Sequence, residues 1–344
     1  MPILPRFSTR TCPFPERRGA LLLALAAALC SAALLSLRCG SQSYSLAELL
    51  AALRRGDAED TVWRILFYVR IPRTLAAALA GAALALAGAL IQAVLNNAMA
   101  SPNIIGVNAG AGFAALGIAA LLPHLPGVIP MASFLGALGT ALLIYLLAVR
   151  AGLSRSSLIL AGLAVSSMLT AGTNTLTLLF PETVIGASGF LLGGFSGVTL
   201  AGVKSAAGYL AAGAALAIAL AVDLNVLQLG EESAAGLGLS VGRVRMLAIV
   251  AAALLAGGAV SFCGLLGFVG LLVPHMARRL MGGDNRWLFP AAAFLGGAFV
   301  LVCDVLARVL FAPFELPVGI VLSLLGGPFF LHLLLRRKRS RVYD

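Results

Sequence analysis

Long apolar stretches separated by short polar segments dominate this chain from end to end. A helix of roughly 20 apolar residues is long enough to cross the hydrocarbon core of a bilayer. The pattern predicts ten such helices, at residues 20–37, 72–95, 104–122, 128–149, 157–180, 203–222, 244–263, 265–281, 288–308 and 317–335. The eighth is short and rich in Gly, so we expect it to be bent or tilted. The pattern therefore predicts an all-α, polytopic membrane protein with about ten transmembrane helices.

Composition supports this fold class. Of the 344 residues, 60% are hydrophobic and only 11% are charged, far less charge than a soluble domain of this length needs on its surface. A net charge of +11 can indicate nucleic-acid binding. Here, however, the basic residues lie between apolar runs and at both ends, without interleaved aromatic residues. This distribution is typical of a protein in contact with the lipid bilayer and argues against a nucleic-acid partner.

The distribution of Lys and Arg also predicts the orientation. The apolar run that follows Arg17 and Arg18 lacks a small-x-small cleavage pattern, so we expect a retained first helix and not a signal peptide. With the N-terminus inside, the inner segments hold 16 of the 24 basic residues and the outer segments hold 8. Both termini are thus expected to be cytoplasmic, at a cell (inner or plasma) membrane. The expected organisation is a cytoplasmic segment at 1–19, a transmembrane domain at 20–335 and a basic cytoplasmic tail at 336–344.

Side chains that support catalysis or metal binding are scattered. The five Cys and three His residues show no spacing typical of a metal site, a disulfide motif or a nucleophile–base pair. We therefore expect no catalytic residue, no metal and no cofactor. His275, which follows Pro274 within a helix, is expected to have a structural role.

Two polar segments at helix ends favour contacts with partners. Arg70 and Arg73 flank Pro72 at the predicted outer start of the second helix, where they either snorkel to lipid phosphates or dock an acidic external partner. On the inner side, the loop at about 225–243 contains a short helical pattern that a simple connection does not need. Its candidate contact residues are Leu229, Gly230, Glu231, Ala234, Leu237 and Gly238. An amphipathic turn at the membrane interface is the alternative for this loop.

Polar residues within the predicted helices suggest a pathway. Ser166, Thr170, Asn174 and Thr177 share one face of the fifth helix, at positions i, i+4, i+8 and i+11. This stripe either lines a water-filled pore or satisfies its hydroxyl groups on carbonyl groups of its own helix. Asp304 and Arg308 are four residues apart near the end of the ninth helix, a spacing that allows an ion pair.

Several motifs together resemble the FecCD-type permeases of ABC importers for iron-siderophore, haem and vitamin B12. The resemblance covers nearly the whole chain, from about Arg70 to Arg336, with the motifs in family order. The Arg-x-Pro-Arg motif is present at 70–73, and Gly-Leu-x-x-Pro-His is kept at 270–275. Two motifs are altered: Ala98 replaces the usual Pro in the segment at 97–102, and Asn285 replaces the usual His in Asp-His-Arg at 284–286.

The resemblance implies a ten-helix, BtuC-like subunit that pairs with a second copy or a paralogue around a central pore. It implies that two cytoplasmic ATP-binding subunits dock on the loop at 230–238, and that the fifth helix borders the pathway. It also implies that an external substrate-binding protein places acidic lobes against Arg70, Arg73 and Arg308, and that the substrate is a metal chelate. The chain has no Walker-type Gly-rich loop, so it is not expected to bind ATP.

Two other classes of function remain as alternatives. An ion-coupled secondary transporter would carry acidic residues near the middle of the bilayer, but most acidic residues here lie in loops or near helix ends. An intramembrane enzyme would need a cluster of His, Asp, Glu or Ser residues on facing helices. Co-purification with an ATP-binding subunit would separate the importer from both alternatives.

Overall fold

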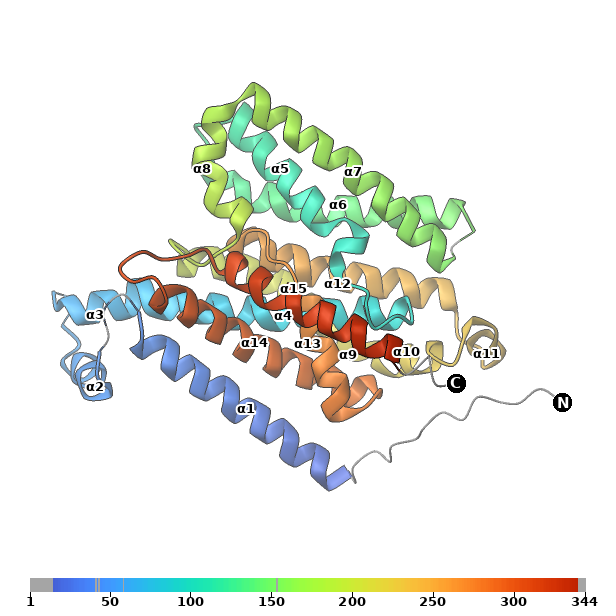
Figure 1. Cartoon of the computed structure of the whole chain (residues 1–344), viewed down its shortest axis with the longest axis horizontal. Coiled ribbons are helices and arrows are strands. Elements are labelled where there is room, and N and C mark those ends of the chain that lie inside the picture. The colour runs from blue at the N-terminus through green and yellow to red at the C-terminus, as the bar shows by residue number, and fades with distance from the viewer. Residues whose placement is uncertain (1–14, 41, 43, 58, 153, 340–344) are drawn as a thin grey trace.

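The computed structural model describes residues 15–40, 42, 44–57, 59–152 and 154–339, which form a helical bundle without strands (Figure 1). In chain order the α-helices are α1 Pro15–Arg38, α2 Leu46–Arg55, α3 Thr61–Ile65, α4 Ile71–Val94, α5 Val107–Leu121, α6 Ile129–Arg150, α7 Arg155–Leu179, α8 Pro181–Leu192, α9 Leu200–Ala219, α10 Ala221–Leu227, α11 Glu231–Gly236, α12 Val241–Cys263, α13 Val269–Met281, α14 Asn285–Val309 and α15 Val318–Arg339. Single π- or 3₁₀-helical turns lie at η1 Leu66–Arg70, η2 Pro102–Ile105 and η3 Pro126–Val128.

Each of the ten predicted apolar helices is present, as α1, α4, α5, α6, α7, α9, α12, α13, α14 and α15. Within the described residues, seven segments are long and apolar enough to cross a membrane, and two shorter apolar helices are found at Val107–Leu121 and Val318–His332. The remaining predicted helix, α13, has 13 residues and carries Arg278 and Arg279 in its last turn. The predicted all-α polytopic fold is therefore confirmed. Most residues of the expected terminal segments at 1–19 and 336–344 lie outside the described residues.

The eighth predicted helix starts later than the apolar pattern indicates. α13 begins at Val269, because Gly264 and Phe268 adopt left-handed backbone conformations with φ of 71° and 63°. The intervening residues are not helical, and the Leu265 N–H donates to the Phe190 carbonyl group at 2.9 Å. These irregular residues join α12 to α13 and contact the end of α8.

Helix α4 forms the centre of the bundle, and 19 of its 24 residues are buried. Small residues let neighbouring backbones approach it closely. A Cβ added at Gly81 would lie 2.2 Å from the Gly296 carbonyl oxygen on α14, and one at Gly88 would lie 1.8 Å from that of Gly270 on α13. Neither glycine can therefore carry a side chain without moving a helix, so the small-residue runs in the sequence serve packing here.

The bundle has two opposite ends (Figure 1). The end that carries Arg70, Arg73 and Arg308 is called the arginine end, and α2 and α3 lie beside it. The other, called the α11 end, carries α10 and α11, together with the start of α1 and the end of α15. Because both described chain ends lie there, the ten helices make an even number of passes. Helices α5 to α8 form a group on one side, and α7 runs along its outer edge.

Candidate functional site

Two helices supply the predicted arginines at the arginine end. Arg70 and Arg73 are three residues apart in the first turns of the segment η1–α4, so they share a face, while Arg308 lies in the last turn of α14. The π-helical turn of η1 ends two residues before Pro72. A proline ring clashes with the carbonyl group four residues earlier, and a wider turn relieves that clash.

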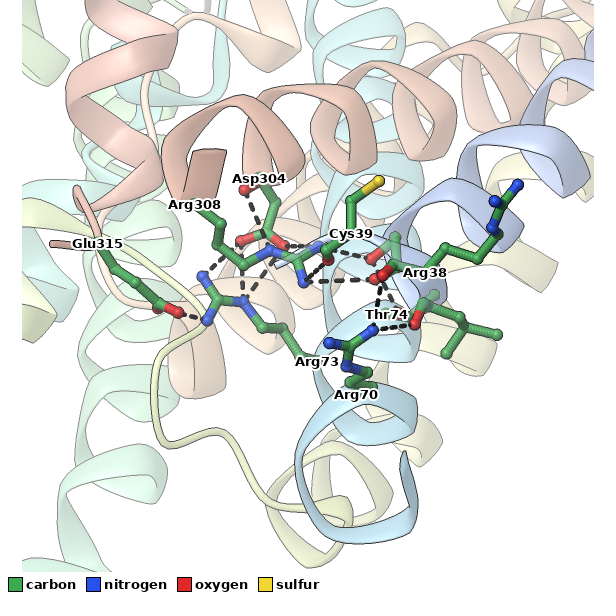
Figure 2. Close-up of polar contacts among 10 residues, drawn as sticks. Arg38, Cys39, Arg70, Arg73, Thr74, Asp304, Arg308 and Glu315 are labelled. Carbon is green, nitrogen blue, oxygen red and sulfur yellow. Dashed lines mark hydrogen bonds and ion pairs between the residues drawn. The ribbon is translucent and has the colours of Figure 1, made fainter. Parts of the chain in front are cut away.

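Asp304 is the centre of the cluster (Figure 2). Its carboxylate is fully buried, accepts hydrogen bonds from Arg73 and forms an ion pair with Arg308. Arg73 donates from Nε and Nη2 to Oδ1 at 3.1 and 3.0 Å, and Arg308 Nη2 lies 3.0 Å from Oδ2. Arg73 also donates to Glu315 Oε2 at 2.6 Å. The ion pair expected between Asp304 and Arg308 is thus present, and Arg73 connects it to the segment that precedes α15.

Other guanidinium donors of Arg70 and Arg308 bond backbone carbonyl groups at the end of α1 and in the residue that follows it. Arg308 Nη1 donates to the Cys39 carbonyl oxygen at 2.8 Å, and Arg70 Nη1 donates to those of Leu37 and, at 2.9 Å, Arg38. The Arg70 guanidinium also lies 4.6 Å from the centre of the Tyr44 ring, within the range of a cation–π contact. The arginines therefore tie the end of α1 to α4 and α14.

The three arginines are more buried than predicted for side chains that snorkel to lipid or extend toward a partner. Arg70, Arg73 and Arg308 expose only 5%, 7% and 4% of their surface. They do not extend into solvent or toward lipid, because carboxylate and carbonyl oxygens of this chain already surround them. All three nevertheless border one open cleft of about 90 Å³, which is lined by Gly40, Gln42, Tyr44, Ile65, Val69, Arg70, Arg73, Arg308 and Glu315. The sequence-predicted docking residues are thus brought together at a single cleft.

At the α11 end, an ion pair fixes the short helix α11. Arg245, near the start of α12, is 5% exposed, and its guanidinium contacts both carboxylate oxygens of Glu231. Glu231 is the first residue of α11 and follows Gly230, whose φ of 112° favours glycine. Gly238, with φ of 85°, ends the turn that follows α11. The two glycines and the ion pair together determine where α11 lies.

The exposed surface of this segment differs from the predicted one. Leu229 and Leu237 are 66% and 68% exposed, so both present apolar side chains to the surroundings. The expectation that Ala234 belongs to this contact face requires correction. Its side chain is fully buried in the hydrophobic core with Leu227, and its carbonyl group accepts from the Leu239 N–H at 3.0 Å.

The polar stripe on α7 divides into two parts. Thr170 and Asn174 are exposed along the outer edge of the bundle, and the Thr170 hydroxyl donates to the Ser166 carbonyl group at 2.8 Å. Thr177, half-buried, similarly donates to the Thr173 carbonyl group of its own helix at 2.7 Å. Ser166 instead faces the core, because a Cβ at Gly106 would lie 3.3 Å from its hydroxyl oxygen. The structure therefore does not place all four residues on one open surface.

A comparison with protein-family models decides what this architecture is. The model of the FecCD transport family matches residues 26–336, almost the whole chain. The chain belongs to the FecCD transport family.

Individual relatives of the family cover most of the chain. It is 37% identical over 93% of its length to the Fe(3+) dicitrate transport system permease protein FecD of Escherichia coli (strain K12), of which it covers 99%. It is 34% identical to the hemin transport system permease protein HmuU of Yersinia pestis, with 83% of this chain and 87% of the relative aligned. Among solved structures, a metal-chelate type ABC transporter in an inward-facing conformation matches with a TM-score of 0.82 and 28% identity, covering 92% of this chain and 99% of that one.

Membership of the FecCD family assigns the general role of the chain. Members of this family are permeases of ABC transporters, which are transport channels and not enzymes, and they work with a partner permease copy and an ATPase. The chain is accordingly embedded in a membrane. The predicted resemblance to this family is confirmed.

Sequence reasoning missed residues whose role depends on distant contacts. Arg245 follows the inner loop in sequence, and only the fold shows that it holds Glu231. Glu315 occurs in a recognisable Glu-Leu-Pro segment, but its partner Arg73 is 242 residues away. Asn225 carries no motif at all, although it joins α10 to the start of α14.

Proposed function

We propose that this chain is the membrane-spanning permease subunit of an ABC importer that moves a metal chelate of the iron-siderophore, haem or cobalamin class into the cell. Separate ATP-binding subunits supply the ATP chemistry. The observation that carries the proposal is the match to ABC permeases over nearly the whole chain, combined with candidate contact sites at opposite ends of the bundle.

The arginine end then faces outward and receives the substrate-binding protein. The cleft bordered by Arg70, Arg73 and Arg308 is open, and its three guanidinium groups outnumber the two carboxylates, Asp304 and Glu315. This excess of positive charge favours an acidic group of a partner. Charge pairs of this kind steer association and set register more than they add affinity.

The α11 end then faces the cytoplasm and receives the ATPase. Leu229 and Leu237 supply exposed apolar contacts, while Glu231, Gly230 and Gly238 hold the segment in shape. Ala234 contributes from beneath this surface by packing α11 on the core.

The pathway then runs between two permease copies, along α7. Only 17% of the most apolar window of α7 is buried in the single chain, which leaves the side that bears Thr170 and Asn174 open to a second copy. Hydroxyl groups that bond their own helix carbonyl groups can line such a pathway without strong affinity for the substrate.

Reconstitution tests the proposal. The permease is purified with its cognate ATPase and binding protein, and placed in proteoliposomes. Uptake of radiolabelled ferric citrate, a ferric hydroxamate, haemin and cyanocobalamin is then measured with and without ATP. We expect ATP-dependent uptake of one of these chelates that requires the binding protein. Uptake driven by a proton or sodium gradient without the ATPase would instead identify a secondary transporter.

A further inference from the structure

Asn225 joins two elements at the α11 end. It lies on α10, which leads directly to α11, and its side-chain amide bonds the beginning of α14 twice. Its Nδ2 donates to Asp284 Oδ1 at 2.8 Å, and its Oδ1 accepts from the backbone N–H of Asn285 at 2.9 Å. Because the donor and the acceptor of one amide are both used on adjacent residues, the amide fixes its position relative to α14. Asn225, Asp284 and Asn285 are called the α10–α14 clasp.

Asp284 is an ionised acceptor in this clasp. It is the N-cap of α14 and accepts from the Arg286 backbone N–H at 3.1 Å. The Arg286 guanidinium, at 2.9 Å, and the amide of Asn225 lower the pKa of Asp284 to about 2. The bond from Asn225 is therefore charge-assisted at physiological pH, and such bonds are about twice as strong as bonds between neutral groups.

Helix α14 extends from the clasp to the arginine end. At 1.5 Å per residue, its 25 residues span about 38 Å, enough to cross the hydrocarbon core. Its far end carries Asp304 and Arg308, which belong to the cluster around the candidate docking cleft. One continuous helix is thus anchored by polar side chains to α10 at one end and to Arg73 at the other.

The two ends of α14 differ in how many of the buried polar atoms around them have hydrogen-bond partners. The carboxylate of Asp304 forms ion pairs with both Arg73 and Arg308. At the clasp, by contrast, Gln228 Nε2 and both side-chain polar atoms of the fully buried Asn285 have no hydrogen-bond partner among the described residues. Buried polar groups without partners are rare in folded proteins. The clasp therefore retains donors and acceptors with which it can form another set of bonds.

We propose that Asn225 is a positioning residue that couples α14 to the ATPase-facing segment, so that movement of α11 is passed to the docking cleft through the α10–α14 clasp. This inference rests on the function proposed above. It differs from a purely structural role in one measurable respect: the clasp is required for communication between the two ends, and not only for folding.

The test compares basal ATP hydrolysis with hydrolysis stimulated by the loaded binding protein, in the full reconstituted complex. For Asn225→Ala we expect basal hydrolysis to remain and the stimulation to fall about tenfold, the size of effect that losing a charge-assisted hydrogen bond produces. Asn225→Asp should have the same effect, since it places a second carboxylate against Asp284. The matched control is Arg286→Ala, which removes an ion pair to the same carboxylate from a side chain that is 63% exposed. We expect this control to leave the stimulation unchanged.

A swap keeps the inference testable if Asn225→Ala does not fold. In Asn225→Asp combined with Asp284→Asn, the carboxylate at position 225 can accept from the Asn285 N–H. Because Asp284 Oδ1 accepts from both Asn225 and the Arg286 N–H, the amide at position 284 must turn so that its NH₂ group donates to residue 225 and its oxygen caps α14. Restored stimulation in the swap supports the inference. An unchanged ratio of stimulated to basal hydrolysis in the folded single variants, or a folded swap that stays unstimulated, overturns it. If the wild-type complex itself shows no stimulation and no ATP-dependent uptake, the proposed function fails instead.

Discussion

Single residues at the arginine end show how a membrane protein stabilises buried charge. A guanidinium or carboxylate removed from water costs several kcal/mol unless other groups replace its hydration. Here Asp304 forms ion pairs with Arg73 and Arg308. The carbonyl oxygens of Leu37, Arg38 and Cys39 accept hydrogen bonds from Arg70 and Arg308. Neither the spacing of Asp304 and Arg308 nor the Arg-x-Pro-Arg motif could predict this. The carbonyl oxygens belong to the last residues of α1 and the residue after it, which lie 33 and 32 residues from Arg70 and 269 residues from Arg308 in the sequence.

Neutralising Asp304 should strongly destabilise the protein. Asp304→Asn leaves the buried Arg308 guanidinium without a carboxylate and Arg73 with Glu315 alone, and breaking a buried pair in this way costs about 3–5 kcal/mol. Glu315→Gln is the matched control, because the Glu315 side chain is 33% exposed and water can replace it. Thermal unfolding of the detergent-solubilised protein measures both variants. Equal unfolding temperatures for the two would contradict the central role of Asp304.

Docking at the arginine cleft should depend on charge in the partner. Reversing Arg70 or Arg73 would disturb the internal network, so the informative change is made on the binding protein. Replacing the surface glutamates of both its lobes by glutamine should slow association about tenfold or more, because long-range attraction is lost. Stopped-flow association measured at increasing salt checks this, with a variant of distant acidic residues as the control. A rate independent of salt would leave the cleft without a docking role.

At the scale of elements, the apolar pattern predicts the long helices well and the short ones poorly. The ten runs are found because each contains enough apolar residues for the signal to be clear. α2, α8 and α10, with 10, 12 and 7 residues, were not predicted. Such short helices depend on caps and on tertiary packing, as at α2, where Ser45 and Glu48 form a capping box. The inner loop was correctly expected to contain a helical pattern, but which of its residues are exposed depends on the Arg245–Glu231 ion pair.

The exposed leucines beside α11 should carry contact with the ATPase. Leu229→Ser with Leu237→Ser removes two largely exposed apolar side chains and should weaken binding of the ATPase subunit about tenfold or more, because burial of one leucine contributes about 1.5–3 kcal/mol. Pull-down of the ATPase from detergent solution measures the effect.

Two further variants serve as comparisons for the double leucine variant. Leu53→Ser on α2 is the matched control, since Leu53 is 46% exposed at the opposite end of the bundle. Ala234→Trp should also stop transport, but by disrupting the packing of α11, because its position is fully buried. A double leucine variant that retains the ATPase at wild-type level would remove these side chains from the interface.

At the scale of the whole molecule, the structure shows where the basic residues that predict the orientation lie in space. The described arginines expected on the inner side gather at the α11 end, where Arg150, Arg243 and Arg278 lie at or next to helix ends. The sequence could predict this asymmetry because helix order alone determines which loops share a side. It could not predict which side chains meet across the bundle, since helices distant in sequence, such as α4 and α14, form its centre.

The orientation of the molecule is testable with two cysteines on opposite ends. In a variant with the five native cysteines replaced by alanine, Arg54→Cys labels the exposed end of α2, and Ser233→Cys labels the exposed side of α11. Positively charged loops stay on the cytoplasmic side during insertion, so the α11 end should be inside. A membrane-impermeant maleimide should therefore modify Arg54→Cys in intact cells, or in spheroplasts if an outer membrane is present, and should modify Ser233→Cys only after permeabilisation. Because the side chains at both sites are exposed on the protein surface, a difference in labelling reports access across the membrane and not burial. The reverse pattern would place the arginine cleft in the cytoplasm, where an external binding protein cannot reach it, and would overturn the docking and coupling assignments together.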